Sequence, residues 1–114
     1  MRTRAIYGCA GLALSDEERA FFREARPWGF ILFARNIDDR AQVLELCTAL
    51  RETVGDTRAP ILIDQEGGRV ARMKPPHWAE RPAAARFGAM YEAAPDVARE
   101  ACYLNARAIA YDLA

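Results

Sequence analysis

The stretch Gly29-Phe30-Ile31-Leu32-Phe33 is a continuous apolar run rich in aromatic residues. It is too short for a helix and does not alternate between apolar and polar residues, so we expect a strand buried on both faces, as in parallel sheets. A second run, Ala59-Pro60-Ile61-Leu62-Ile63-Asp64, predicts another buried strand, with its proline tolerated near the start. These two strands point to an α/β fold.

Helical patterns precede and follow the first of these strands. Ser15 and Glu18 have the spacing of a capping box, which predicts a helix that begins there and ends before Pro27. On its apolar side we expect Ala20, Phe21 and Ala25. Asp38 or Asp39 can cap a second helix. Its apolar stripe at helical spacing consists of Val43, Leu44, Leu46, Cys47, Leu50 and Val54.

Three further segments complete the expected order of elements. Residues 5–9 could form a short first strand, and residues 65–94 form a long connection rich in Gly, Pro and Arg, a length that usually indicates function. A last helix is predicted from Pro95 to the end, with an apolar side of Val97, Ala101, Leu104, Ala108 and Ile109.

The resulting order, β-α-β-α-β-loop-α, implies parallel strands joined by right-handed crossovers. Such a pattern closes either as an open doubly wound sheet or as a (β/α)8 TIM-type barrel. A barrel needs about 250 residues, so on that interpretation the barrel is incomplete in this chain of 114 residues.

Composition excludes several classes of function. Sixteen basic residues balance sixteen acidic ones, so no global field attracts the chain to nucleic acid or to acidic membranes. The three cysteines are odd in number and widely spaced, which fits neither a disulfide framework nor a CxxC metal knuckle, so we expect buried free thiols and a reducing compartment. No apolar run approaches the roughly 20 residues that span a bilayer, and polar residues 15–18 follow the weak N-terminal apolar stretch at once. We therefore predict a cytoplasmic protein without a secretory signal.

The segment Ile63-Asp64-Gln65-Glu66-Gly67-Gly68-Arg69-Val70-Ala71-Arg72 is the most informative for function. Asp64 comes at the carboxyl end of a predicted parallel strand, where α/β proteins bind ligands. The Gly67-Gly68 pair permits a sharp turn that can hold Arg69 and Arg72 over the strand ends. Carboxylate and guanidinium groups together suit a polyol, but they could equally form a structural ion pair that closes the turn.

Other polar residues allow more than one interpretation. Glu66 could act as an acid or base, or as a partner of Arg69 or of another arginine. Arg35-Asn36 follows the first apolar strand and could cap a loop or contact a ligand, whereas His77, in a loop, is expected to be an exposed bystander. Neither GxGxxG nor GxxxxGK[ST] occurs, which argues against nucleotide-dependent chemistry. The sequence predicts neither a metal ion nor an organic cofactor.

Several of these motifs together resemble the opening of bacterial glycoside hydrolase family 3 β-N-acetylhexosaminidases. The resemblance runs from about Gly29 onward and rests on Ile31-Leu32-Phe33-Ala34-Arg35-Asn36, Gln42, Ile63-Asp64-Gln65-Glu66-Gly67-Gly68-Arg69-Val70 and Arg81-Pro82. It implies a (β/α)8 barrel hydrolase that removes terminal N-acetylglucosamine with retention of configuration. The substrate class implied is an N-acetylglucosamine-containing muropeptide, trimmed in the cytoplasm during peptidoglycan recycling.

The same resemblance assigns roles to two residues. Asp64 matches the family aspartate that holds hydroxyls of the nonreducing sugar, and Arg72 matches a second substrate-binding position. The family's nucleophile and its acid/base dyad lie further downstream, so no catalytic residue is assigned in this chain. Residues 1–114 are then the N-terminal segment of a single barrel domain, inactive alone. The alternatives are a family 3 β-glucosidase-like enzyme and a non-catalytic sugar-binding or interaction module.

Overall fold

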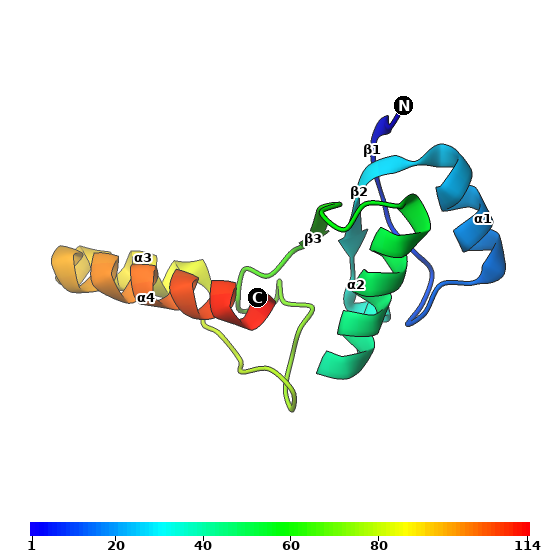
Figure 1. Cartoon of the computed structure of the whole chain (residues 1–114). Helices are drawn as coiled ribbons and strands as arrows, with labels where there is room; N and C mark the ends of the chain where they lie inside the picture. Colours follow the sequence, from blue (N-terminus) through cyan, green and yellow to red (C-terminus); the bar gives the residue numbers. More distant parts are fainter. The chain divides into compact units, whose positions relative to one another are not determined.

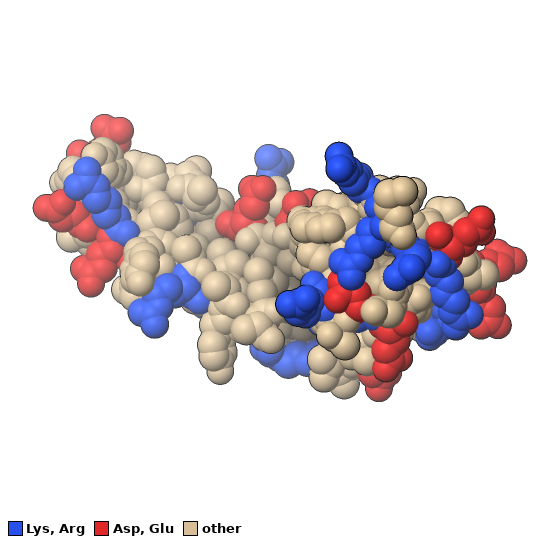
Figure 2. Space-filling model, turned by 45° about the horizontal axis from the view of Figure 1, so that its top comes forward, with Lys and Arg blue, Asp and Glu red and all other residues tan.

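The computed structural model describes all residues from Met1 to Ala114 and divides them into two compact units, Met1–Asp64 and Gln65–Ala114 (Figure 1). The first unit contains three strands and two α-helices, and the second contains two further α-helices. Basic and acidic side chains are interspersed on the face shown in Figure 2. None of the helices combines the length and the apolar content that crossing a bilayer would require.

The first unit is built on a parallel sheet with the strand order β1-β2-β3. Its strands are β1 (Thr3–Tyr7), β2 (Pro27–Leu32) and β3 (Ile61–Ile63). Phe30 pairs with Ile61 and Leu32 with Ile63, so β2 and β3 end level with each other. The predicted order of strands and their parallel pairing are confirmed, although β1 begins and ends two residues earlier than expected.

Local capping signals position both helices of this unit. In α1 (Asp16–Ala25), Ser15 Oγ accepts from the Glu18 N–H at 3.1 Å, and Glu18 Oε2 accepts from the Ser15 N–H at 3.0 Å. This is the predicted capping box. In α2 (Arg40–Val54), Asp39 Oδ1 accepts from the Gln42 N–H at 2.8 Å. Asp38 and Asp39 were both proposed as the N-cap of this helix, and Asp39 is the residue that caps it.

The hydrophobic core lies where α1 and α2 pack on one face of the sheet. It consists of Cys9, Leu14, Phe22, Phe30, Leu32, Leu46, Leu50, Val54 and Ala59. The prediction for the apolar side of α1 was wrong, because Phe22 is 3% exposed and packs edge-on against Phe30, whereas Phe21 is 49% exposed. Leu44 on α2 is likewise exposed. Helical spacing defines several overlapping faces, and contact with the sheet selects the one that is buried.

The opposite face of the sheet is apolar but partly exposed. Ile31 pairs with Leu62, and Ile6 pairs with Gly29, so these side chains share the face that points away from Phe30. Ile6 is 43% exposed and Leu62 37%. The expectation that β2 and β3 are buried on both faces is therefore wrong, since α1 and α2 both contribute to the core on the other side.

The second unit ends in a pair of contacting helices, α3 (Ala84–Ala93) and α4 (Pro95–Leu113). Pro95 occupies the first turn of α4, as predicted. The prediction of a structureless connection over residues 65–94 was wrong in its last part, because α3 occupies ten of those residues. Its alanines favour a helix strongly enough to tolerate Gly88 in the interior.

The side of α4 that is shielded from solvent matches the predicted one only in part. Ala98 is buried, and Ala101, Asn105, Ala108 and Ile109 are partly buried, whereas Val97 and Leu104 are exposed. Three of the shielded positions carry alanine, whose small side chain allows close approach of another helix. Cys102 lies outside this face and is exposed. All three cysteines are free, as predicted, but only Cys9 is buried and Cys47 is partly buried.

Candidate functional site

The carboxyl edge of the sheet in the first unit brings together the segments that follow its three strands. Gly8 and Cys9 follow β1, the 3-10 turn Ala34–Asn36 follows β2, and Asp64 follows β3 directly. Asp64 is exposed. Its predicted position at the carboxyl end of the third parallel strand is therefore confirmed, and this is the edge at which α/β proteins bind ligands.

Asn36 holds this edge together from inside. It is 0% exposed, and its Nδ2 donates to the carbonyl oxygens of Cys9 at 3.1 Å and of Gly11 at 2.8 Å. Its Oδ1 accepts from the Phe33 N–H at 2.9 Å. Asn36 thus ties the segment after β1 to the segment after β2, and the loop-capping interpretation is confirmed for this residue.

In the second unit, the Gly67-Gly68 pair forms the tight turn that the sequence predicted. Both residues have positive φ angles, +87° and +60°, and Gly67 forms an antiparallel bridge with Val70. The Glu66 N–H donates to the Val70 carbonyl at 2.7 Å, and the Gly68 N–H donates to the Arg81 carbonyl at 2.8 Å. A Cβ atom on Gly67 would collide with the Pro82 carbonyl oxygen. The turn therefore requires glycine for its backbone conformation and for its packing.

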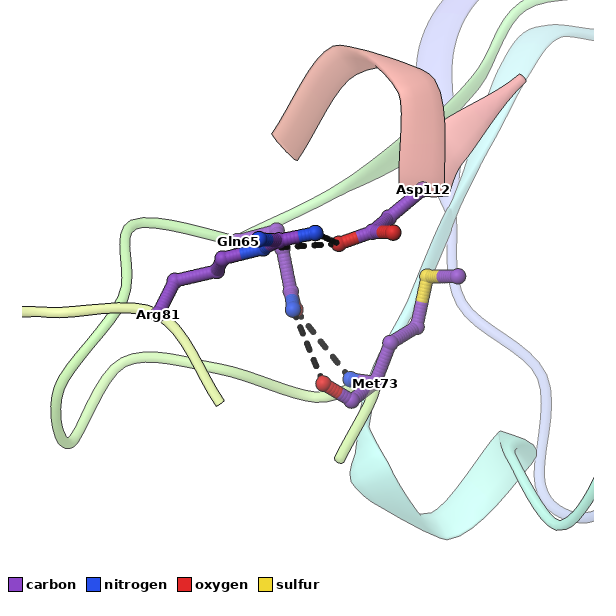
Figure 3. A network of polar contacts seen from close by, with 4 residues as sticks. All are labelled: Gln65, Met73, Arg81 and Asp112. Carbon is purple, nitrogen blue, oxygen red and sulfur yellow. Dashed lines mark hydrogen bonds and ion pairs between the residues drawn. The ribbon is translucent and has the colours of Figure 1, made fainter. Parts of the chain in front are cut away.

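The Gln65 side chain fixes the backbone of the segment that contains Arg72. Gln65 Oε1 accepts from the N–H groups of Arg72 at 2.8 Å and Met73 at 3.1 Å, and Gln65 Nε2 donates to the Met73 carbonyl at 2.9 Å. Figure 3 shows the Gln65 amide directed at the Met73 backbone. No role was predicted for Gln65. Its position in the motif Ile63–Val70 was the one feature of the sequence that could have indicated a role for it.

In the second unit, an ion pair connects the segment before α3 to the last turn of α4. Arg81 donates from Nε at 3.1 Å and from Nη2 at 2.9 Å to the same oxygen, Oδ2, of Asp112 (Figure 3). The Asp112 side chain is only 8% exposed. Sequence reasoning missed this pair because 31 residues separate its members.

The other candidate residues differ in how far they are exposed to solvent. Arg72, in the second unit, is partly buried, and Glu66 and Arg69 are exposed on either side of the glycine turn. His77 is exposed, in agreement with the sequence interpretation. No group of three or more His, Cys, Asp or Glu side chains lies close enough together to hold a metal ion.

The sequence of this chain is similar to those of bacterial beta-hexosaminidases. A beta-hexosaminidase of Xanthomonas oryzae is 38% identical over 110 residues, which are 95% of this chain and 32% of that protein. The chain is a homologue of bacterial beta-hexosaminidases. It spans about a third of the length of the curated relatives it matches. No family model matches the chain.

Solved structures agree with this relationship. NagZ of Neisseria gonorrhoeae in complex with N-trifluoroacetyl-D-glucosamine superposes with a TM-score of 0.88 at 26% identity, over 98% of this chain and 32% of that one. A family 3 beta-N-acetylglucosaminidase of Paenibacillus gives a TM-score of 0.65 at 32% identity, over 73% of this chain and 16% of that one. The resemblance drawn from the motifs is therefore confirmed.

Proposed function

We propose that residues 1–114 form the N-terminal portion of a single (β/α)8 barrel domain in a retaining β-N-acetylhexosaminidase that removes terminal N-acetylglucosamine. The main support is the 38% identity to a beta-hexosaminidase across 95% of the chain. The three parallel strands with their intervening helices follow the order in which such a barrel begins.

In this proposal Asp64 binds the sugar. Its exposed carboxylate stands directly after β3 and can accept hydrogen bonds from neighbouring sugar hydroxyls. Arg72 is the second proposed substrate-binding residue. Its backbone N–H donates to the Gln65 side chain, which holds in place the point from which the Arg72 side chain extends.

The proposed substrate is an N-acetylglucosamine-containing muropeptide, trimmed in the cytoplasm during peptidoglycan recycling. A small carbohydrate ligand agrees with the NagZ relative, whose structure contains N-trifluoroacetyl-D-glucosamine. The muropeptide and the recycling role rest on the motif resemblance.

Retaining hydrolysis needs a nucleophile and an acid/base group on opposite sides of the scissile bond. We assign neither the nucleophile nor the acid/base group within residues 1–114, because Asp64 is proposed to bind the sugar. The isolated chain should therefore not hydrolyse a chromogenic N-acetylglucosaminide. Turnover that Glu66→Gln abolishes would contradict this assignment and make Glu66 catalytic.

The binding role of Asp64 can be tested in a chimera in which residues 1–114 replace the matching third of the Xanthomonas relative. Asp64→Ala should lower kcat/KM, because each sugar hydroxyl left unpaired costs about 1–3 kcal/mol. Glu45→Ala, which removes an exposed carboxylate from the outer helix α2, is the matched control. Equal kcat/KM for both variants would contradict the proposed role.

A further inference from the structure

One side of α4 carries a row of large apolar side chains that are open to solvent. Val97 is 57% exposed, Leu104 is 52% exposed and Tyr111 is 82% exposed. These residues are seven positions apart in the sequence, so they lie along one face of the helix, two turns from one another. Exposed apolar rows of this kind mark surfaces on which another chain packs.

Two alanines extend this row into a heptad pattern. Ala101 and Ala108 each follow one of the large residues by four positions and precede the next by three, which is the spacing of a coiled-coil seam. Both alanines are partly buried, whereas the large residues are exposed. We call these five positions, 97, 101, 104, 108 and 111, the α4 seam. Along the seam, a large side chain alternates with a small one.

This alternation suits an antiparallel pair of identical helices. In such a pair, Val97 lies opposite Ala108 of the second copy. Leu104 likewise lies opposite Ala101 of the second copy, so each large side chain fills the space that an alanine leaves. The register overlaps the two helices over residues 94–111, almost the whole of α4. A parallel pair would place like opposite like, so that large side chains would meet and the alanines would leave gaps.

The charged residues beside the seam favour the same arrangement. Glu100 and Arg107 are exposed, and each directly precedes a seam alanine, so they flank the seam on one side. In the antiparallel register, Glu100 of one copy comes opposite Arg107 of the other, and the twofold symmetry repeats this contact. In a parallel pair, Glu100 would instead lie beside the uncharged Asn105 of the second copy.

We propose that two copies of this chain form an antiparallel homodimer through the α4 seam, with an ion pair between Glu100 and Arg107 on each side of the twofold axis. The partner is a second copy because the surface is complementary to itself in size and in charge, as a twofold interface requires. This assignment concerns assembly and is independent of the sugar-binding role proposed for Asp64.

The test measures dimerisation of the 114-residue chain by sedimentation equilibrium. It uses the Leu62→Lys background, because the partly exposed apolar face of the sheet offers another contact. In this background, Glu100→Arg and Arg107→Glu should each weaken the dimer about tenfold, since each turns both interchain ion pairs into like-charge contacts. The double variant should restore the dimer. An equimolar mixture of the two single variants should also restore it, as a heterodimer.

Two further variants serve as controls. Arg86→Glu makes the same change of charge at an exposed position of α3 and should leave the dimer unchanged. Leu104→Lys should prevent dimerisation, because it places a charge opposite an alanine in the middle of the seam. Circular dichroism of each variant verifies that the helices are retained.

Three outcomes would overturn the proposal. The first is a Leu62→Lys chain that stays monomeric. The second is a dimer that responds to neither charge change, since its contact would then lie elsewhere or be parallel. The third is a double variant that dimerises no better than the single ones. The role proposed for Asp64 would stand in each case.

Discussion

Gly67 shows how one residue can be fixed by conformation and packing together. Its φ angle of +87° disfavours any side chain, and a Cβ atom would meet the Pro82 carbonyl. Gly67→Ala should therefore lower the free energy of unfolding by about 2 kcal/mol or more. Thermal unfolding of the variant and of the unchanged chain, compared at the same protein concentration, measures this difference in stability.

Gly88 provides a matched control for this substitution. It lies inside α3, and a Cβ atom there would meet nothing within 4 Å. Gly88→Ala should raise the free energy of unfolding by about 0.5–1 kcal/mol, because alanine favours the helix. A Gly67→Ala variant as stable as Gly88→Ala would contradict the structure of the turn.

The three thiols should differ in reactivity. Burial, with a smaller contribution from Glu18, raises the pKa of Cys9 to about 11, and burial also raises the pKa of Cys47. Since the thiolate is the reactive form, both should react slowly with a disulfide reagent at pH 8, and the rate for Cys9 should rise as the pH approaches 11. Cys102, which is exposed, should react first. Rapid modification of all three thiols in the folded chain would refute this ordering.

At the scale of elements, the connection between β1 and β2 depends on buried polar contacts more than on helix capping. Asn36→Ala leaves the partly buried Gly11 carbonyl and Phe33 N–H without their partner, where a fully buried group would cost about 1–3 kcal/mol. Ser15→Ala removes an exposed cap of α1, at about 1 kcal/mol. Chemical denaturation should rank Asn36→Ala as the more destabilising change, with Thr57→Ala, at an exposed turn position, as the reference. The reverse ranking would mean that Asn36 does not anchor the edge.

The elements whose signals are local were predictable from the sequence. Ser15 and Asp39 cap helices through contacts with residues three positions away, and the apolar runs around Phe30 and Leu62 form the strands expected of them. The position of Asp64 at the end of β3 followed from the strand assignment.

The features that depend on distant residues were not predictable. Phe22 rather than Phe21 is buried because the sheet packs against that side of α1. Asp112 and Arg81 are 31 residues apart in the sequence, and the fold of the second unit brings them together. The helix α3 was missed because neighbouring prolines and glycines masked its alanine-rich sequence.

At the scale of the whole molecule, the sheet face that carries Ile6 and Leu62 is a surface that favours association. Both side chains are large, apolar and more than a third exposed, and contiguous patches of this kind promote self-association. The isolated 114-residue chain should therefore sediment as oligomers whose proportion rises with concentration. A single monomeric species with a cooperative thermal transition would contradict this expectation.

Two variants locate the associating surface. Leu62→Lys should shift the chain towards monomer, because it places a charge on the exposed apolar face of the sheet, in its edge strand β3. Leu44→Lys changes an exposed leucine on the outer side of α2 and should leave the distribution unchanged. Equal behaviour of the two variants would place the contact elsewhere.

The contacts of Gln65 make an unusual prediction for deuterium labelling. The amide hydrogens of Arg72 and Met73 lie outside every helix and strand, yet both are bonded to one side-chain oxygen. They should exchange with solvent at similar, slow rates, because a single opening event releases both. Gln65→Ala should accelerate the two together, so that one side chain gives an irregular segment the exchange behaviour of regular secondary structure.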